Sequence, residues 1–271
     1  MTTTAGSLEM RFSDSPTLKQ LYYCFRSFLF DPAAFINRCR AVPYYVIHWI
    51  QYSRRNQDRR FGIKIGDVLY TSADRFAGAG TAKGHYFFQD LWAAQYLYEQ
   101  PVIEHVDVGS RLDGFIAHLL VFSRVVYVDL RPLASEVKNV EFRQGSIVDL
   151  PFDDDSVISL SCLHVIEHIG LGRYGGPIDP NGYLQAAQEL ARVLAPGGIL
   201  LLSTPVGREH LCFDAHRVFD PQTIVEAIRP LQLKEFHLIE DQGLRIVANA
   251  SFETARRCDC GCGLFVFSKT K

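Results

Sequence analysis

The segment from His164 to His168 reads H-V-I-E-H and places two imidazoles and one carboxylate within five residues. This spacing matches the H-x-x-E-H pattern of certain zinc metallopeptidases, in which a helix presents both histidines to the metal and Glu167 would be the base. The neighbouring residues argue against it, because an apolar run (156–163) precedes the motif and several glycines (170–176) follow it. We therefore expect the motif at the end of a strand and predict no metal, with an incidental metal site as the alternative.

Without a metal, the same residues suit proton transfer. Either His164 or His168 could remove a proton from a hydroxyl, with a pKa set by Glu167. Only one histidine should couple strongly to Glu167, because the three side chains project differently. A purely structural hydrogen-bond network is the alternative. Candidates for orienting a polar substrate follow along the chain: Arg173, Tyr174, Asp179, His216 and Arg217.

A second group of candidate residues lies in VDVGSRLDG (106–114), which reads as a strand, a turn and the beginning of a helix. The turn is G-x-x-x-x-G, so it meets neither the dinucleotide pattern G-x-G-x-x-G nor the P-loop pattern. Twenty-two residues after Asp107, the next apolar run ends at Asp129. An acidic residue at that place accepts hydrogen bonds from the ribose hydroxyls of a cofactor.

The charge of this turn favours one cofactor over another. Asp113 is expected at the N-terminus of the helix, where a pyrophosphate requires free N–H groups and no neighbouring carboxylate. S-adenosylmethionine has no phosphate and carries a positive sulfonium, so it tolerates the carboxylate. We therefore predict S-adenosylmethionine as the cofactor, with an NAD-dependent oxidoreductase as an alternative.

A third segment, GSIVDLPFDDDS (145–156), is expected to contact the adenine. Ile147 would flank the ring and Asp149 would accept the adenine amino group; an ordinary polar loop is the alternative. The complete set of predicted cofactor residues is Asp107, Gly109, Ser110, Gly114, Asp129, Leu130, Ile147 and Asp149.

Hydrophobic periodicity and turn residues predict the elements that position these side chains. In residues 101–271, short β-branched runs alternate with helical patterns, which predicts an α/β fold: a Rossmann-like, doubly wound, mostly parallel sheet with an antiparallel edge strand. The expected strands are 103–108, 124–129, 139–143, 156–162, 198–204, 232–239 and 263–269, and the expected helices are 113–122, 181–194 and 221–229. Residues 1–100 form a predicted helical cap or lid, with helices near 16–30, 32–40, 44–54 and 85–100.

Composition and charge limit the partners. The 271 residues carry a formal net charge of −2, which supplies no field to hold a nucleic-acid backbone, so we expect a small-molecule substrate and no nucleic acid. No apolar run reaches the ~20 residues that a bilayer span requires. Seven cysteines, an odd number, suit a reducing compartment, and we expect a cytoplasmic protein. Three of them lie in CDCGCG (258–263), where the spacing favours a loop of small residues over a soft-metal site.

Several segments together resemble known proteins. The turn at 109–114, Asp129, the D-L-P-F segment (149–152) and the R-V-L-x-P-G-G-x-L segment (192–200) are similar to class I S-adenosylmethionine-dependent methyltransferases. More narrowly, the chain resembles an uncharacterised methyltransferase-like family, a domain of unknown function found in nematodes and bacteria. The segments that carry this resemblance are GHYFFQDL (84–91), DVGSRLDGF (107–115), LHVIEHIGLGRYGGPIDP (163–180) and HRVF (216–219).

The resemblance implies an S-adenosylmethionine-dependent methyltransferase that acts on a small polar acceptor, with a sugar or glycan precursor as the narrower hypothesis. The chain departs from the methyltransferase pattern at one place, because its turn lacks the middle glycines of G-x-G-x-G. This departure leaves a non-catalytic scaffold that binds a partner as an alternative. The sequence gives no indication of the oligomeric state.

Overall fold

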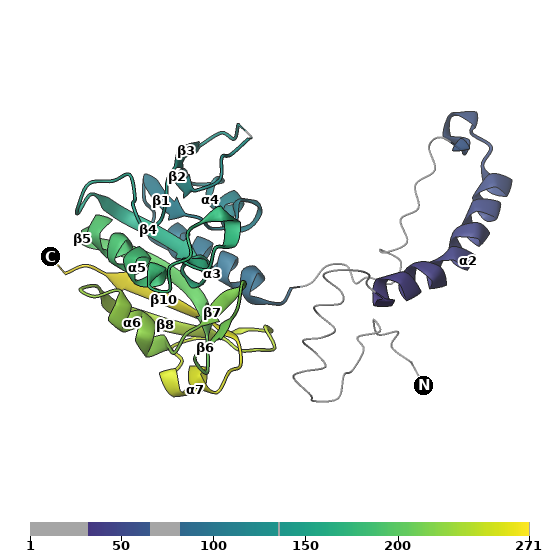
Figure 1. Ribbon diagram of the computed structural model, residues 1–271. Helices are drawn as coiled ribbons and strands as arrows, with labels where there is room; N and C mark the ends of the chain where they lie inside the picture. The colour runs from purple at the N-terminus through teal and green to yellow at the C-terminus, as the bar shows by residue number, and fades with distance from the viewer. Residues whose placement is uncertain (1–31, 66–81, 135, 271) are drawn as a thin grey trace. The chain divides into compact units, whose positions relative to one another are not determined.

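The computed structural model describes residues 32–65, 82–134 and 136–270 (Figure 1). The chain divides into two units, with the boundary between Thr81 and Ala82. In the first unit, helix α2 runs from Pro32 to Arg55 and a short 3₁₀ turn, η1, covers Arg59–Phe61. The prediction of two helices separated near Pro43 is wrong, because α2 continues through this proline, which removes one backbone hydrogen bond and can bend a helix without ending it. The helix expected at 16–30 lies outside the described residues.

The second unit is built on one eight-stranded sheet with the order β3-β2-β1-β4-β5-β10-β8-β9. Its strands are β1 (Glu104–Val108), β2 (Arg124–Asp129), β3 (Val140–Gln144), β4 (Val157–Leu163), β5 (Leu194–Val206), β8 (Gln232–Ile239), β9 (Ile246–Val247) and β10 (Gly261–Ser268). The first five strands are parallel, β10 is antiparallel to both β5 and β8, and the edge strand β9 is antiparallel to β8. The predicted α/β, doubly wound, mostly parallel sheet with an antiparallel edge strand is confirmed.

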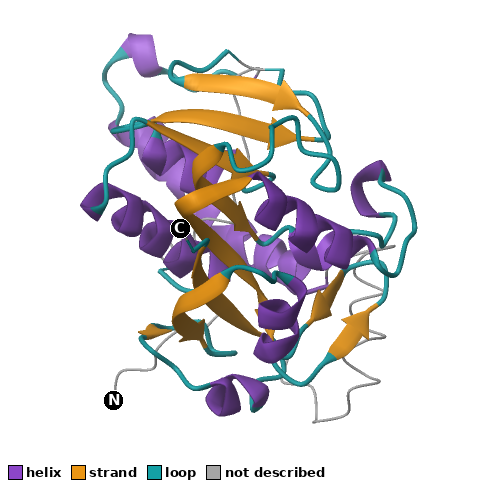
Figure 2. Ribbon diagram, turned by 90° about the vertical axis from the view of Figure 1, so that its left-hand side faces the viewer, coloured by secondary structure: helices purple, strands orange, loops and turns teal. Residues whose placement is uncertain are grey.

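Successive residues of the strands point to opposite faces of the sheet, and each face has its own apolar core. Val126 and Val128 belong to the cluster that contains residues of α5 (Gly182–Val193), α6 (Pro221–Ala227) and α7 (Phe252–Arg256). Val125 and Tyr127 belong to the cluster on the other face, with residues of α3 (His85–Glu99), η4 (Leu112–Ile116) and α4 (Ala117–Leu119). Helices therefore cover both faces of the sheet (Figure 2).

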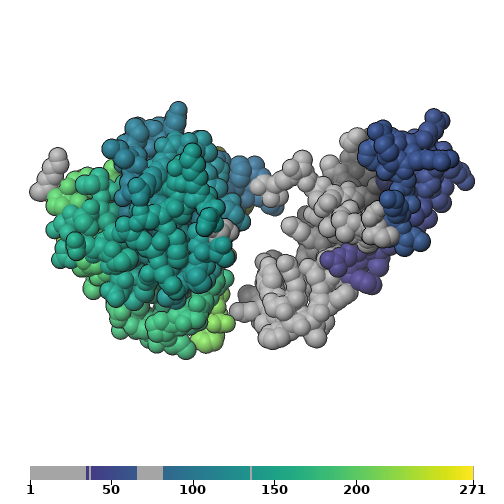
Figure 3. All heavy atoms as spheres, turned by 90° about the horizontal axis from the view of Figure 1, so that it is seen from above, coloured from purple at the N-terminus to yellow at the C-terminus, as the bar shows by residue number. Residues whose placement is uncertain are grey.

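Helix α3 is part of the second unit, which begins at Ala82, whereas the helix expected at 85–100 was predicted to belong to the N-terminal cap. Ala93 and Leu97 are buried in the core on the face of the sheet that also contains Val125 and Tyr127. The space-filling view shows the second unit as one compact body, coloured from blue through teal to green (Figure 3). A short hairpin formed by β6 (His210–Cys212) and β7 (His216–Val218) was not predicted.

The strand order changes direction at β1, which pairs with β2 on one side and with β4 on the other. In doubly wound sheets, ligands bind outside the carboxyl ends of the strands at such a switch point. The chain segments that leave β1, β2 and β4 at this point contain the predicted cofactor turn, Asp129 and the H-V-I-E-H motif. Among the described residues, no helix combines the length and apolarity needed to cross a membrane.

Candidate functional site

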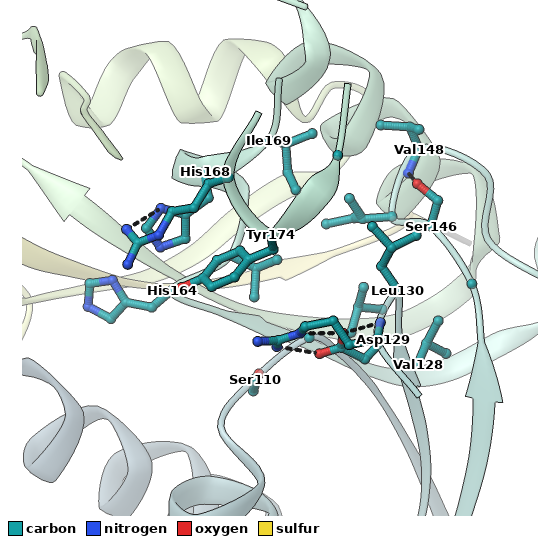
Figure 4. A pocket seen from close by; sticks show the side chains of 18 of the residues that line it. Ser110, Val128, Asp129, Leu130, Ser146, Val148, His164, His168, Ile169 and Tyr174 are labelled. Carbon is teal, nitrogen blue, oxygen red and sulfur yellow. Dashed lines mark hydrogen bonds and ion pairs between the residues drawn. The ribbon is translucent and has the colours of Figure 1, made fainter. Parts of the chain in front are cut away.

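A cavity of about 460 Å³ lies at the carboxyl ends of β1, β2 and β4. Asp129, His164, His168 and Tyr174 gather around it (Figure 4). The predicted site residues that line it are Gly109, Ser110, Asp129, Leu130, Ile147, His164, His168, Arg173, Tyr174 and Asp179. The predicted site residues outside its lining are Asp107, Gly114, Asp149, Glu167, His216 and Arg217.

The turn after β1 is shaped by Asp107, which is fully buried. Its Oδ1 accepts a hydrogen bond from the backbone N–H of Ser110 at 3.0 Å, and its Oδ2 accepts one from Ser110 Oγ at 2.6 Å. Gly109 has a φ of 72°, and a Cβ there would lie 3.1 Å from Val165 Cγ1, so the turn requires glycine at this position. Asp107 thus holds the turn that forms part of the cavity wall but does not itself line the cavity.

A chain of buried polar side chains continues from Asp107 beneath the cavity. Ser161 Oγ donates to Asp107 Oδ2 at 2.5 Å, and the ring of His105 lies between Ser161 and Ser159, at 2.8 and 2.7 Å. Burial raises the pKa of Asp107 to about 7 and lowers the pKa of His105 to about 3. Sequence reasoning missed His105 and both serines, although polar residues at every second position of β1 and β4 were a usable signal.

Asp129 ends β2 at the rim of the cavity. Its Oδ1 accepts hydrogen bonds from the backbone N–H and Nε of Arg131, and its Oδ2 accepts them from Arg131 Nη2 at 2.8 Å and the Tyr127 hydroxyl at 3.0 Å. Burial acts to raise the pKa of Asp129, but the hydrogen bonds from Arg131 outweigh it and hold this pKa below its usual range. The Arg131 guanidinium also lies 4.7 Å from the Tyr174 ring centre. A ligand that binds Asp129 must therefore share this carboxylate with Arg131 or displace it.

Two of the predicted cofactor residues, Gly114 and Asp149, do not line the cavity. Gly114 packs against the Asp90 carboxylate of α3, and a Cβ at this position would clash with it, so the glycine allows the helix to approach the turn. Asp149 is exposed and faces a separate groove beside Arg143 and Arg192. Ser146, from the same turn, lines the cavity instead.

The H-V-I-E-H motif begins directly after β4, and its residues Ile166–His168 form the 3₁₀ turn η5, so the predicted position at a strand end is confirmed. His164 Nδ1 lies 2.6 Å from Oε1 of the fully buried Glu167, and Thr204 Oγ1 donates to the other carboxylate oxygen at 3.3 Å. Burial opposes charge on both partners, but their attraction lowers the pKa of Glu167, and attraction to Cys262 and Glu167 raises the pKa of His164. His164 is therefore the histidine that couples to Glu167.

His168 has a different environment. Its Nδ1 lies 2.6 Å from the carbonyl oxygen of Ala215, which fixes the proton on Nδ1, because a carbonyl can only accept. Arg173 Nη1 donates to the same carbonyl at 2.9 Å. His168 Nε2 lies 3.8 Å from Glu167 Oε1, and burial lowers the pKa of His168. The ring is thus neutral near neutral pH and keeps a lone pair on Nε2.

The loop over the cavity is held by residues predicted to bind substrate. Arg217 Nη1 donates to the carbonyl of Ile169 at 2.7 Å, and its Nη2 donates to the carbonyl of Pro180 at 3.2 Å. The guanidinium groups of Arg131 and Arg173 lie 4.7 and 4.9 Å from the ring centre of Tyr174, whose backbone has a left-handed φ of 60°. Arg217 therefore positions the loop, whereas Arg173 and Tyr174 form part of the cavity wall.

Comparison with family models matches residues 134–231 to a family described as "Caenorhabditis protein of unknown function, DUF268". The match spans β3 to α6 and includes the H-V-I-E-H motif. A search of curated proteins finds no match.

Several solved structures are similar to this chain. The N-methyltransferase NodS from Bradyrhizobium japonicum WM9, in complex with S-adenosyl-L-homocysteine, has a TM-score of 0.49 and 15% identity, covering 68% of this chain and 86% of NodS. An S-adenosylmethionine-dependent methyltransferase from Clostridium acetobutylicum ATCC 824 has a TM-score of 0.48 and 10% identity, covering 70% and 94%. The [4+2]-cyclase SpnF has a TM-score of 0.47 and 13% identity, covering 66% and 81%. At this degree of likeness they assign neither an activity nor a cofactor to this chain.

Proposed function

We propose that residues 82–271 form an S-adenosylmethionine-dependent methyltransferase that acts on a small polar acceptor. The observation that carries this proposal is that one cavity, at the switch point of the sheet, is lined by both Asp129 and His168. The first is an ionised carboxylate suited to ribose hydroxyls, and the second is a neutral imidazole suited to taking a proton.

The cofactor side of the cavity fits S-adenosylmethionine in size and charge. A volume of about 460 Å³ lies within the range of small-molecule sites, and the apolar residues Leu130 and Ile147 are available to flank an adenine. Asp113 presents an exposed carboxylate at the beginning of η4, where Arg111 forms an ion pair with it at 3.0 Å. This carboxylate is unfavourable for a pyrophosphate and acceptable for a cation, although Arg111 reduces its effect. S-adenosylmethionine supplies a methyl group on a positive sulfur when it is bound.

The acceptor side contains charged and hydrogen-bonding groups. Arg173, Tyr174 and Asp179 line the cavity in the loop after η5 and would orient a polyhydroxylated acceptor such as a sugar or glycan precursor. His168 Nε2 would accept the proton of the reacting hydroxyl, while the bond from Nδ1 to Ala215 fixes the ring. Glu167 would act indirectly, by holding His164 in place.

A specific observation supports the alternative of a non-catalytic scaffold. Arg131 occupies both oxygens of Asp129, and the turn after β1 lacks the middle glycines of methyltransferases. If the ion pair persists, the ribose position stays closed and the cavity binds another ligand. An NAD-dependent oxidoreductase is the second alternative, and Asp113 disfavours it.

Titration calorimetry with S-adenosyl-L-homocysteine and NAD, side by side on the full chain, distinguishes these functions. The proposal predicts saturable one-site binding of S-adenosyl-L-homocysteine and at least about tenfold weaker binding of NAD, equivalent to about 1.4 kcal/mol. Tighter binding of NAD would support the oxidoreductase, and no binding of either ligand would support the scaffold.

A further inference from the structure

Three potential metal ligands converge beside the cavity from elements that are far apart in the sequence. His85 begins α3, His164 follows β4 and Cys262 lies in β10. One donor atom of each residue lies within 4.8 Å of the other two. In a tetrahedral zinc site, the Zn–N and Zn–S distances place the ligand atoms about 3.3–3.6 Å apart, so small side-chain rotations would complete the geometry.

His164 provides a second observation that points to a ligand. Its Nε2 is the one buried side-chain nitrogen or oxygen without a hydrogen-bond partner in the part of the chain that the structure describes. Only 6% of the His164 side chain is exposed. A buried polar atom without a partner is unfavourable, and a metal ion would satisfy it.

Glu167 prepares His164 for this role. A metal-binding histidine commonly donates its other N–H to a carboxylate, which fixes the tautomer and the ring orientation. Glu167 Oε1 lies 2.6 Å from His164 Nδ1, so Nδ1 keeps a proton, and a metal ion would take the place of the proton on Nε2. The ring of His85 is stacked on that of His164, with 5.3 Å between centres and 6° between planes.

We infer that His85, His164 and Cys262 bind one zinc-type metal ion, with the fourth position open toward the cavity that His164 lines. Two imidazoles and a thiolate are a donor set that suits Zn²⁺, and binding releases to solvent the proton of the Cys262 thiol and the proton of His164 Nε2. The site differs from a metallopeptidase arrangement, because His168 is not a ligand and Glu167 supports His164. The inference does not depend on methyl transfer, and with His164 on the metal, His168 remains the base of the proposed reaction.

The expected role of the ion is to join the beginning of α3 to the ends of β4 and β10. Tyr86, adjacent to His85, lines the cavity, so the ion would fix this part of the wall. The residue pair Cys260 and Cys262 supplies a matched control. Cys260 precedes Cys262 by two residues, but its sulfur lies 3.9 Å from His216 Nε2 and is not part of the cluster.

The test measures metal content and spectra of the full chain and its variants after incubation with Zn²⁺ or Co²⁺ and removal of unbound ion. We expect about one ion per chain and a sulfur-to-cobalt charge-transfer band for the unmodified protein and for Cys260→Ser. Cys262→Ser and His85→Gln should lose the ion, and Cys262→Ser should also lose the band. Glu167→Gln should bind about 10–100-fold more weakly.

The melting temperature supplies a readout that is independent of spectroscopy. Added Zn²⁺ should raise it for the unmodified protein and for Cys260→Ser, and leave His85→Gln unchanged. His85 is only partly buried at a helix terminus, so this variant is expected to fold. An unmodified protein that binds no ion, or variants that keep the ion when Cys262 or His85 is replaced, would overturn the inference.

Discussion

Two layers of the same residue types, one within the central strands and one at their carboxyl ends, have opposite properties. The inner layer contains His105 and Asp107, and burial makes both reluctant to carry charge, with pKa values of about 3 and about 7. The rim contains His168 and Asp129, where Arg131 keeps the carboxylate ionised and His168 keeps a lone pair on Nε2. Residue type alone therefore does not make a group able to bind a ligand; the burial of the group and its hydrogen-bond partners decide this.

The largest expected effect concerns the rim histidine. His168→Ala should lower turnover of an identified hydroxyl acceptor about 10²–10⁴-fold, the usual contribution of a general base, with cofactor affinity nearly unchanged. Burial lowers the pKa of His168, so the rate should be constant above neutral pH and fall in acid, with an apparent pKa below the ordinary ~6.5. Steady-state kinetics across pH, together with calorimetry of the cofactor, measures both.

The inner histidine is the matched control. His105→Gln should lower the melting temperature, because it disturbs the hydrogen bonds to Ser159 and Ser161, and leave the pH profile of the rate unchanged. If His168→Ala keeps full turnover, the base lies elsewhere and His216 becomes the next residue to test.

The next effect concerns stability as a function of pH. The pKa of an unfolded aspartate is about 3.9. In the folded state, burial raises the pKa of Asp107 to about 7. The hydrogen bonds from Ser110 and Ser161 oppose this rise, and the charge of Asp129 adds to it. The folded state thus binds more protons between these values, so the stability contributed by Asp107 is complete below pH ~4 and is lost as the pH rises through about 7. Denaturant unfolding should show Asp107→Asn gaining stability relative to the unmodified protein over this window.

Asp129→Asn provides the contrast in the same measurement. The pKa of Asp129 is lowered in the folded state, so its contribution is complete above pH ~4 and is lost only in stronger acid. The free energy of unfolding that Asp129→Asn loses should therefore be constant between about pH 5 and about pH 8. This range lies about one unit or more above the pKa of Asp129. Parallel pH dependence of the two variants would contradict the separation into an inner layer and a rim.

The fold could be predicted from the sequence because it depends on local patterns. The predicted strands 103–108, 124–129 and 232–239 differ from β1, β2 and β8 by at most one residue, since β-branched runs bounded by turn residues mark them clearly. The break near Pro43 was wrong because a local signal was given more weight than helix continuity. β6 and β7 are three-residue strands, too short to produce a periodic pattern.

The site could be predicted only where neighbouring residues build it. The turn at 109–114, Asp129 and the H-V-I-E-H motif lie at strand ends, so the parallel sheet brings them together. Asp149 was predicted to line the cavity, but its side chain lies in a separate groove. Residue spacing does not determine the direction in which the side chain of a turn residue points. Cys262 lies 98 positions after His164 and 177 positions after His85 along the chain, and no sequence motif records the approach of these three residues.

The central claim is that Asp129 binds the ribose of the cofactor, and calorimetry with S-adenosyl-L-homocysteine on two variants tests it most directly. Asp129→Ala should lose about 1.5–3 kcal/mol of binding free energy, the range for a hydrogen bond to a charged group, which is roughly a 10- to 150-fold weaker dissociation constant. The exposed Asp149→Ala should bind as tightly as the unmodified protein. A melting curve for each variant, with Asp129→Asn as a more conservative replacement, establishes that the chain is folded. An unchanged dissociation constant in folded Asp129→Ala, or an equal loss in Asp149→Ala, would contradict the account.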